Sequence, residues 1–133
     1  MPAPSSYDYA FIRVVPQADT GEFLNVGVIL FCRTQRFLGA AIELDEARLR
    51  ALDPIIDVES VKEHLALIPE ICAGKGPIGE LGQAESFHWL VAPHDTVIQT
   101  SPVHAGLCSD PAAALDRLKK DVSRKDAKPQ RRE

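Results

Sequence analysis

The sequence lacks any long apolar segment and contains few aromatic residues. Its longest apolar run, Val26 to Cys32, is seven residues long, whereas a helix that crosses a bilayer needs about 20 residues. The first residues, MPAPSSYDY, hold no basic segment followed by an apolar one, which a secretory signal would require. We therefore expect no signal peptide, no membrane span and no membrane partner.

Cysteine is scarce, and its pattern excludes a disulfide framework. The three cysteines, Cys32, Cys72 and Cys108, are odd in number and far apart, and two of them lie in apolar stretches. Disulfides persist mainly in oxidising compartments, where small domains use paired and closely spaced cysteines. The pattern predicts reduced thiols and a cytoplasmic location.

Charge is distributed unevenly along the 133 residues. Residues 117–133 carry eight Lys and Arg against three Asp and Glu, and the whole chain has a net charge of −4, which leaves −9 for residues 1–116. An acidic body is a poor general surface for nucleic acid, because phosphate contacts need clustered cations. From length and composition we predict one globular domain, residues 1–121, followed by a basic and flexible tail, residues 122–133.

Hydrophobic periodicity predicts an α+β fold. Residues 7–15 alternate with period two, residues 23–33 are apolar on both faces, and residues 37–44 follow a short turn. These three segments predict an N-terminal antiparallel three-stranded meander. A later strand near residues 96–100 is expected to extend this sheet.

Helices are expected over residues 46–52, from 58 into the low seventies, and over 112–122. Asp45 and Asp57 are the expected N-caps of the first two. In the second helix, Val61, Leu65 and Ile68 belong to one apolar stripe that should face the sheet. We expect the helices to pack mainly on one face of the sheet.

Several segments together resemble domain of unknown function 3037, a bacterial family. They are YDYAFIRVVP, EFLNVGVILFCR with FLGAAIEL, and FHWLVAP followed by TVIQTSPVHAGL. The resemblance covers about residues 7–118 and leaves the tail outside. It implies no catalytic residues. Genes of this family often lie beside genes for HipA-like kinases, so the resemblance implies a protein partner of that kind.

The stretch from Ser86 to Cys108 is rich in residues whose side chains could bind a metal ion or take part in catalysis. It holds three of the four histidines, His88, His94 and His104, and the single tryptophan, Trp89. A metal site, a nucleophilic triad, a binding cleft and a well-packed hairpin are the alternatives. No CxxC or HxxxH pair is present, and structural zinc needs about four ligands. We predict no metal and no cofactor, and we expect the stretch to form a sheet edge and a cleft rim anchored by Trp89.

A nucleophilic site would rest on Ser101, three residues before His104, but the chain has no GxSxG elbow. Pro102 prevents this segment from being a fully paired central strand. We expect His104 to be the polar residue around which a functional site is organised, with Gln99 and Ser101 close by.

Two polar residues lie inside apolar strands, where an unpaired polar group is costly. For Asn25, the alternatives are a backbone-bonding role at a bulge near Gly27 and a functional role. For Arg13, the alternatives are an internal ion pair with Glu43 and a contact with an anion or a partner.

Three functional hypotheses follow. The leading one is a small interaction or regulatory protein, and the alternative is a nucleic-acid-associated protein that uses the basic tail and an aromatic sheet face around Tyr9. The third is a small enzyme with a site around His104. No catalytic residue can be assigned. The candidate binding residues are Arg13, Asn25, His88, Gln99, Ser101 and His104.

Overall fold

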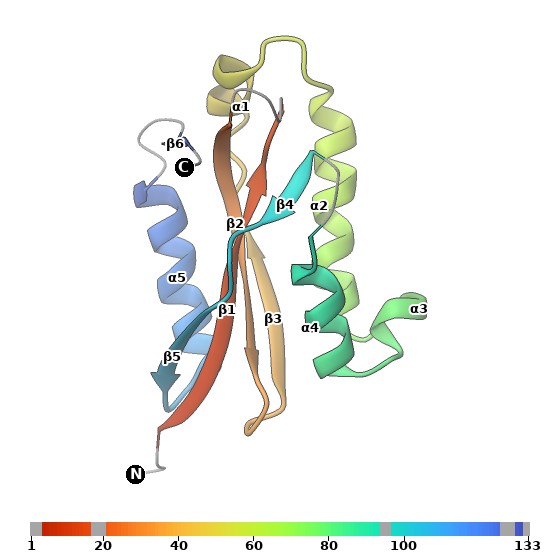
Figure 1. The fold of residues 1–133 in the computed structure, drawn as a ribbon, viewed down its shortest axis with the longest axis vertical. Helices are drawn as coiled ribbons and strands as arrows, with labels where there is room; N and C mark the ends of the chain where they lie inside the picture. The colour runs from red at the N-terminus through yellow and green to blue at the C-terminus, as the bar shows by residue number, and fades with distance from the viewer. Residues whose placement is uncertain (1–3, 17–20, 94–96, 126–129, 132–133) are drawn as a thin grey trace.

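The computed structural model describes residues 4–16, 21–93, 97–125 and 130–131. Its elements run in the order β1 (Ser5–Val14), β2 (Glu22–Cys32), β3 (Phe37–Ile42), α1 (Glu46–Leu52), α2 (Val58–Cys72), α3 (Gly76–Gly79), α4 (Gln83–Val91), β4 (Ile98–Thr100), β5 (His104–Cys108), α5 (Pro111–Lys125) and β6 (Gln130–Arg131). This order confirms the α+β class and the N-terminal meander (Figure 1). No helix among the described residues has the length and apolar character needed to cross a membrane.

The sheet is built around β1 and β2. Strands β3, β2 and β1 are antiparallel neighbours, and the other side of β1 is shared by two short strands. The second half of β1 pairs with β4, whereas its first half pairs with β5. The later strand that the sequence predicts is therefore two strands, separated by a bend at residues 101–103.

A β-bulge interrupts the pairing of β1 with β2. Ile12 lies opposite Gly27 and Arg13 lies opposite Asn25, which leaves Val26 as the extra residue. Gly27 is required here, because a Cβ atom at this position would lie 2.6 Å from the carbonyl oxygen of Ala41. A bulge therefore lies at Asn25 and Gly27, where one of the two alternatives for Asn25 placed it.

Helices cover both faces of the sheet, and most of them lie on one face. On that face α1, α2 and α4 bury a core that includes Ile12, Leu49 and Leu65. The opposite face is covered by α5, which buries Tyr7, Phe11 and other side chains against β2 and β3. Figure 1 shows the sheet between α5 and the pair α2 and α4.

The predicted caps and apolar stripes explain where the helices begin and which of their faces are buried. The carboxylates of Asp45 and Asp57 accept hydrogen bonds from Arg48 N and Ser60 N, both at 3.1 Å, so each satisfies an orphan donor of its helix. In α2 the stripe of Val61, Leu65, Ile68 and Cys72 is buried as predicted.

The last helix runs past Asp121, the residue after which the sequence predicts the tail. Helix α5 continues to Lys125, and Val122 is fully buried against the sheet. Beyond the helix, Gln130 and Arg131 pair with the start of β2.

A candidate groove between α2, α4 and β4

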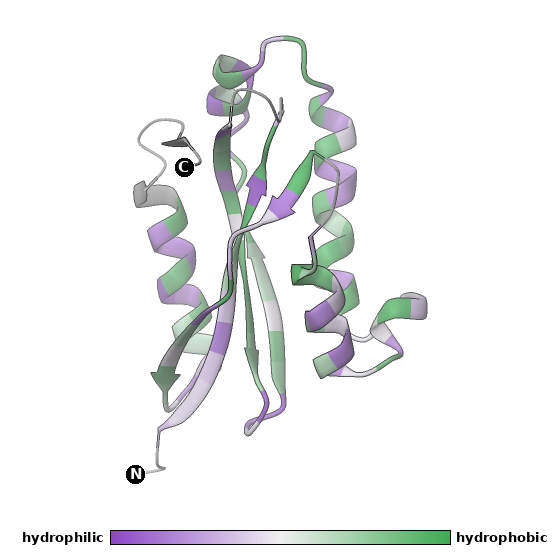
Figure 2. Cartoon of the chain, in the orientation of Figure 1, coloured by the Kyte–Doolittle hydropathy of each residue, from purple (hydrophilic) through white to green (hydrophobic). Residues whose placement is uncertain are grey.

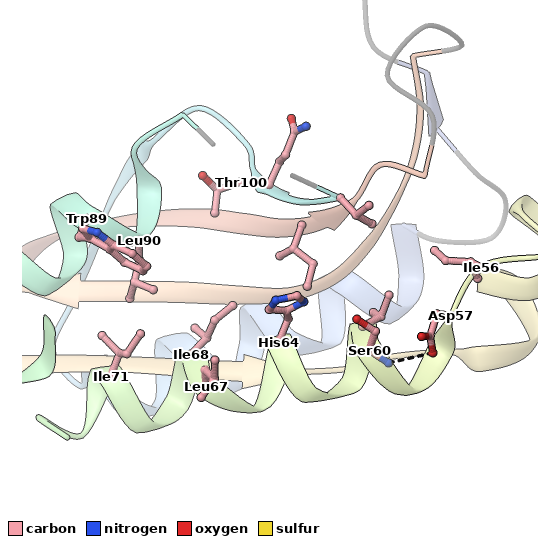
Figure 3. A pocket seen from close by; sticks show the side chains of 14 residues that line it. Ile56, Asp57, Ser60, His64, Leu67, Ile68, Ile71, Trp89, Leu90 and Thr100 are labelled. Atoms are coloured by element: carbon pink, nitrogen blue, oxygen red, sulfur yellow. Dashed lines mark hydrogen bonds between the residues drawn. The ribbon is translucent and has the colours of Figure 1, made fainter. Parts of the chain in front are cut away.

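A groove of about 520 Å³ lies beside α2, on the side of the sheet that carries most helices. Helix α2 forms one wall, and α4 and β4 form the other (Figure 3). Its lining residues are Ile56, Asp57, Ser60, Val61, His64, Leu67, Ile68, Ile71, Trp89, Leu90, Val97, Ile98, Gln99 and Thr100. Pockets of this volume are typical of binding sites.

The groove is apolar at its floor and along its rim. Val61, Ile68 and Leu90 are buried core residues that line it from below. At the rim, Leu67 is 52% exposed, Trp89 44% and Val97 40%. These are three of the seven large hydrophobic side chains that are exposed among the described residues, so exposed apolar surface gathers here.

The sequence of α2 creates this wall through a second stripe. Ser60, His64, Leu67 and Ile71 each precede a residue of the core stripe by one position. Because successive helical residues are about 100° apart, this second stripe faces sideways from the first. Figure 3 shows His64 projecting from α2 into the groove, and Trp89 and Leu90 of α4 at the end of the groove near Ile71.

Hydrogen bonds between side chains and backbone hold the walls in place. Asp57 caps α2 through the amide of Ser60, at the end of the groove near Ile56 (Figure 3). On the other wall, the hydroxyl of Thr100 donates to the carbonyl oxygen of Val91 at 3.4 Å, which ties β4 to the end of α4. These hydrogen bonds therefore fix both walls of the groove.

An acidic stripe borders the groove on α2. Glu59, Glu63 and Glu70 are exposed, and helical geometry places them next to the groove stripe on the side away from the core. Lys62 lies 3.7 Å from Glu59 and 3.4 Å from Glu46, so this cation is engaged within the acidic surface. The outer side of α2, next to the groove, is thus negatively charged.

Three of the candidate residues from the sequence form a row across the sheet. Arg13 on β1 lies opposite Asn25 on β2 and opposite Gln99 on β4. The guanidinium of Arg13 stacks over the ring of Phe23 at 4.1 Å. The carboxylate of Glu43, its expected ion-pair partner, lies 3.5 Å from Lys119 of α5.

Asn25 is buried, and its Oδ1 accepts no hydrogen bond within the described part of the chain. Because Asn25 neighbours Arg13 in β-sheet register, the row combines a buried amide with a stacked cation. It lies on the α5 face of the sheet, since Ile98 and Thr100, on either side of Gln99, pair with Val14 and Ile12 of the other core.

Ser101 and His104 are not part of that row, and they make different contacts. The Ser101 hydroxyl accepts from Phe11 N and donates to Pro102 O, both at 2.9 Å, and the side chain is buried. Its bonds hold the bend between β4 and β5 against β1. His104 is exposed on β5, and its ring lies 5.5 Å from that of Tyr9.

The remaining expectations concern the start of the histidine-rich stretch. His88 is exposed on α4, and His94 lies outside the described residues. Trp89 lies on the rim of the groove, as the expected cleft rim requires, but it is carried by helix α4 and not by a sheet edge. The buried aromatic residue of α4 is Phe87. Within the described residues, no three His, Cys, Asp or Glu side chains gather closely enough to hold a metal ion.

The thiols of Cys72 and Cys108 are not activated for nucleophilic chemistry. Burial raises the pKa of Cys72 to about 12. Desolvation raises the pKa of Cys108 as well, with further contributions from Cys32 and Asp110. Since the thiolate is the reactive form, a raised pKa disfavours attack by these two sulfur atoms at neutral pH.

The groove residues of α2 are not among the candidates that the sequence indicates, although a signal for them is present. His64 was the only histidine outside the histidine-rich stretch, and Leu67 and Ile71 lie beside the core stripe that was identified. The apolar arc of a helix can be wider than its contact with one sheet requires. Such a helix presents a second apolar surface beside that contact. That width was visible in the sequence.

Comparison with known proteins gives one family. The model of the family described as "Protein of unknown function (DUF3037)" matches residues 9–122. A search of curated proteins and of solved structures finds no match.

Proposed function

The chain belongs to the DUF3037 family of proteins of unknown function, and from its groove we propose that it binds a segment of a partner protein. The segment is apolar, is flanked by Lys or Arg, and lies between α2, α4 and β4. The observation that carries this proposal is the gathering of Leu67, Trp89 and Val97 around one groove.

The apolar rim supplies the affinity. Removing apolar surface from water contributes about 25 cal/mol per Å², and the rim side chains have much of their surface left to bury. Tryptophan is among the residues that most often dominate binding energy at interfaces. Trp89 has this role in the proposed complex, which accounts for its position outside the core.

The shape of the groove favours a polypeptide over a small metabolite. The stripe from Ser60 to Ile71 extends along α2 for about 16 Å at the helical rise of 1.5 Å per residue. Its rim residues are half-exposed along that length, so a bound segment can enter from the side. Apolar anchors at regular spacing on an amphipathic segment match such a groove.

The acidic stripe supplies the selectivity. Glu59, Glu63 and Glu70 are exposed on α2 beside the groove stripe, and they favour a segment whose apolar anchors are followed by basic residues. Acidic segments are disfavoured by the same charges. The first partner to test is a HipA-like kinase, in keeping with the gene neighbourhood that the family resemblance implies.

The hypothesis that nucleic acid binds the aromatic face of the sheet gains no support. Tyr7 and Phe11 are buried beneath α5, so these rings are covered where bases would have to stack.

The test uses Trp89 as its probe, because it is the only tryptophan in the chain. A synthetic amphipathic peptide with Leu anchors and Lys flanks is titrated into the protein, with a Glu-flanked peptide of the same length as comparison. We expect the emission of Trp89 to shift with the Lys peptide and to stay constant with the Glu peptide.

Leu67→Lys places a cation in the groove and retains the fluorophore, so it should weaken binding at least about tenfold. Leu81→Lys is the matched control, since Leu81 is exposed and lies outside the groove. An equal loss in both variants, or no shift with either peptide, contradicts the proposal. Calorimetry with a purified HipA-like kinase then tests the partner itself.

A further inference from the structure

A second exposed apolar surface lies on β5, at the edge of the sheet. Strand β5 pairs with β1 along one side, and its other side pairs with no strand in the part of the chain that the structure describes. Helix α5 packs on β2 and β3, which leaves the outer side of β5 open to approach. In Figure 2 the arrow of β5 is coloured hydrophobic, beside the pale and purple start of β1.

The side chains of this edge are apolar where a solvent-facing edge would ordinarily be polar. Leu107 is 69% exposed and Val103, just before the strand, is 45% exposed. Leu107 lies opposite Ser6 and Ala105 lies opposite Asp8, and both β1 residues are exposed. The apolar residues therefore sit at the outer margin of this face, where they contribute little to the core of the monomer.

The usual protections of an edge strand are missing from β5. Natural edges carry Lys, Pro or inward-pointing charges that prevent pairing with another chain. The residues of β5, HAGLC, include no Lys, Arg, Asp, Glu or Pro. An unguarded edge with exposed apolar side chains is suited to strand pairing.

We propose that two copies of the chain associate through β5, so that their sheets join into one antiparallel sheet. The strand is complementary to itself. Antiparallel pairing centred on Gly106 places Leu107 of each copy beside Ala105 of the other, on the same face, so that a large side chain meets a small one.

Charge also favours a second copy at this surface. The body of the chain is acidic, with −9 over residues 1–116, so two copies repel each other over most orientations. Strand β5 has no formal charge when His104 is neutral. Its edge is therefore a surface where two acidic molecules can approach without opposing carboxylates directly across the contact.

The test measures the mass of the full chain in solution against its concentration, by sedimentation equilibrium. We expect a concentration-dependent dimer. Leu107→Lys places two like charges near the joint and should raise the dimer dissociation constant at least about tenfold. Ile55→Lys, at another exposed apolar residue, is the control and should leave the constant unchanged.

Hydrogen exchange identifies the surface. Among the backbone amides of residues 104–108, those that point away from β1 should gain protection as the concentration of the wild-type chain rises. This gain should be absent in Leu107→Lys. A monomer at millimolar concentration overturns the proposal. So does a dimer that both Lys variants leave intact, or one whose amide protection lies elsewhere. Circular dichroism of each variant verifies that it is folded.

Discussion

Ser101 offers a sharp test of whether the bend between β4 and β5 is a structural device. Its hydroxyl accepts a hydrogen bond from Phe11 N at 2.9 Å, and its own backbone N–H donates to Phe11 O at 2.8 Å. The side chain thus replaces the strand partner that β1 lacks at the bend. Replacing Ser101 by Ala removes the first of these bonds and leaves the second.

The expected cost follows from the group left behind. Phe11 is buried, with 8% of its surface exposed, and Ser101 is 4% exposed, so water cannot readily reach the orphaned N–H. A buried donor without a partner costs about 1–3 kcal/mol. We therefore expect Ser101→Ala to lower the free energy of unfolding by about 1–3 kcal/mol and Tm by several degrees.

Urea unfolding followed by circular dichroism measures this change. Ser109→Ala is the control, because Ser109 is exposed, and surface substitutions usually stay within about 0.5 kcal/mol. If Ser101→Ala proves as mild as Ser109→Ala, the hydroxyl does not hold the bend. Peptide binding in the groove that fails in Ser101→Ala without any loss of stability would instead assign Ser101 a binding role.

Three further outcomes are expected. Leu65→Ala, within the α2 core stripe, should lower the free energy of unfolding by about 2–5 kcal/mol, and a loss below about 1 kcal/mol would argue against its core position. His104→Gln should leave stability within about 1 kcal/mol, because the exposed ring loses only its stacking on Tyr9; a larger loss in thermal unfolding would show a structural role. The Cys72 thiol has a folded pKa of about 12 against an ordinary value of 9.0, so its contribution to stability is complete below pH 9 and is lost as pH rises toward 12. Urea unfolding on either side of pH 9 should show a smaller fall for Cys72→Ala than for the wild type, and equal falls would contradict the raised pKa.

Much of the fold could be predicted from the sequence because its signals are local. The alternation in β1, the continuous apolar run in β2 and the stripe in α2 each depend on residues close together in the chain. The caps at Asp45 and Asp57 are equally local. The meander joins consecutive strands by short turns, so its pairing needed no distant information.

The arrangement of the later elements could not be predicted in the same way. That β4 and β5 divide one side of β1 between them depends on contacts about 90 residues apart, such as that of Ser101 with Phe11. Helix α5 covers one face of the sheet by itself. This arrangement depends on the total area of both sheet faces, and no single segment encodes that area. Its consequence for the nucleic-acid hypothesis is that Tyr7 and Phe11 are buried and Tyr9 alone of the three rings stays partly exposed.

The sequence predicts a cleft rim anchored by Trp89, but it does not indicate the helix that carries this residue. Tryptophan suggests a buried anchor on average, but in α4 the buried positions are Phe87 and Leu90. Trp89 projects elsewhere because helical geometry separates it from each of them by about 100° or more. Once α4 is recognised as a helix, the exposure of Trp89 becomes predictable, and with it one wall of the groove.

The two proposed surfaces lie on the same side of β1 but on different halves of it. Strand β4 pairs with Ile12, Arg13 and Val14, whereas β5 pairs with residues 5–9, so occupation of the groove leaves the β5 edge free. A two-fold axis perpendicular to the joined sheet keeps equivalent faces on the same side. Both grooves of a dimer would then open on one side, and a partner that is itself dimeric would bind with higher avidity than either groove provides alone. Leu107→Lys should therefore weaken binding of a dimeric partner while leaving the affinity for a single monomeric peptide unchanged, which separates a loss of avidity from a loss of the groove.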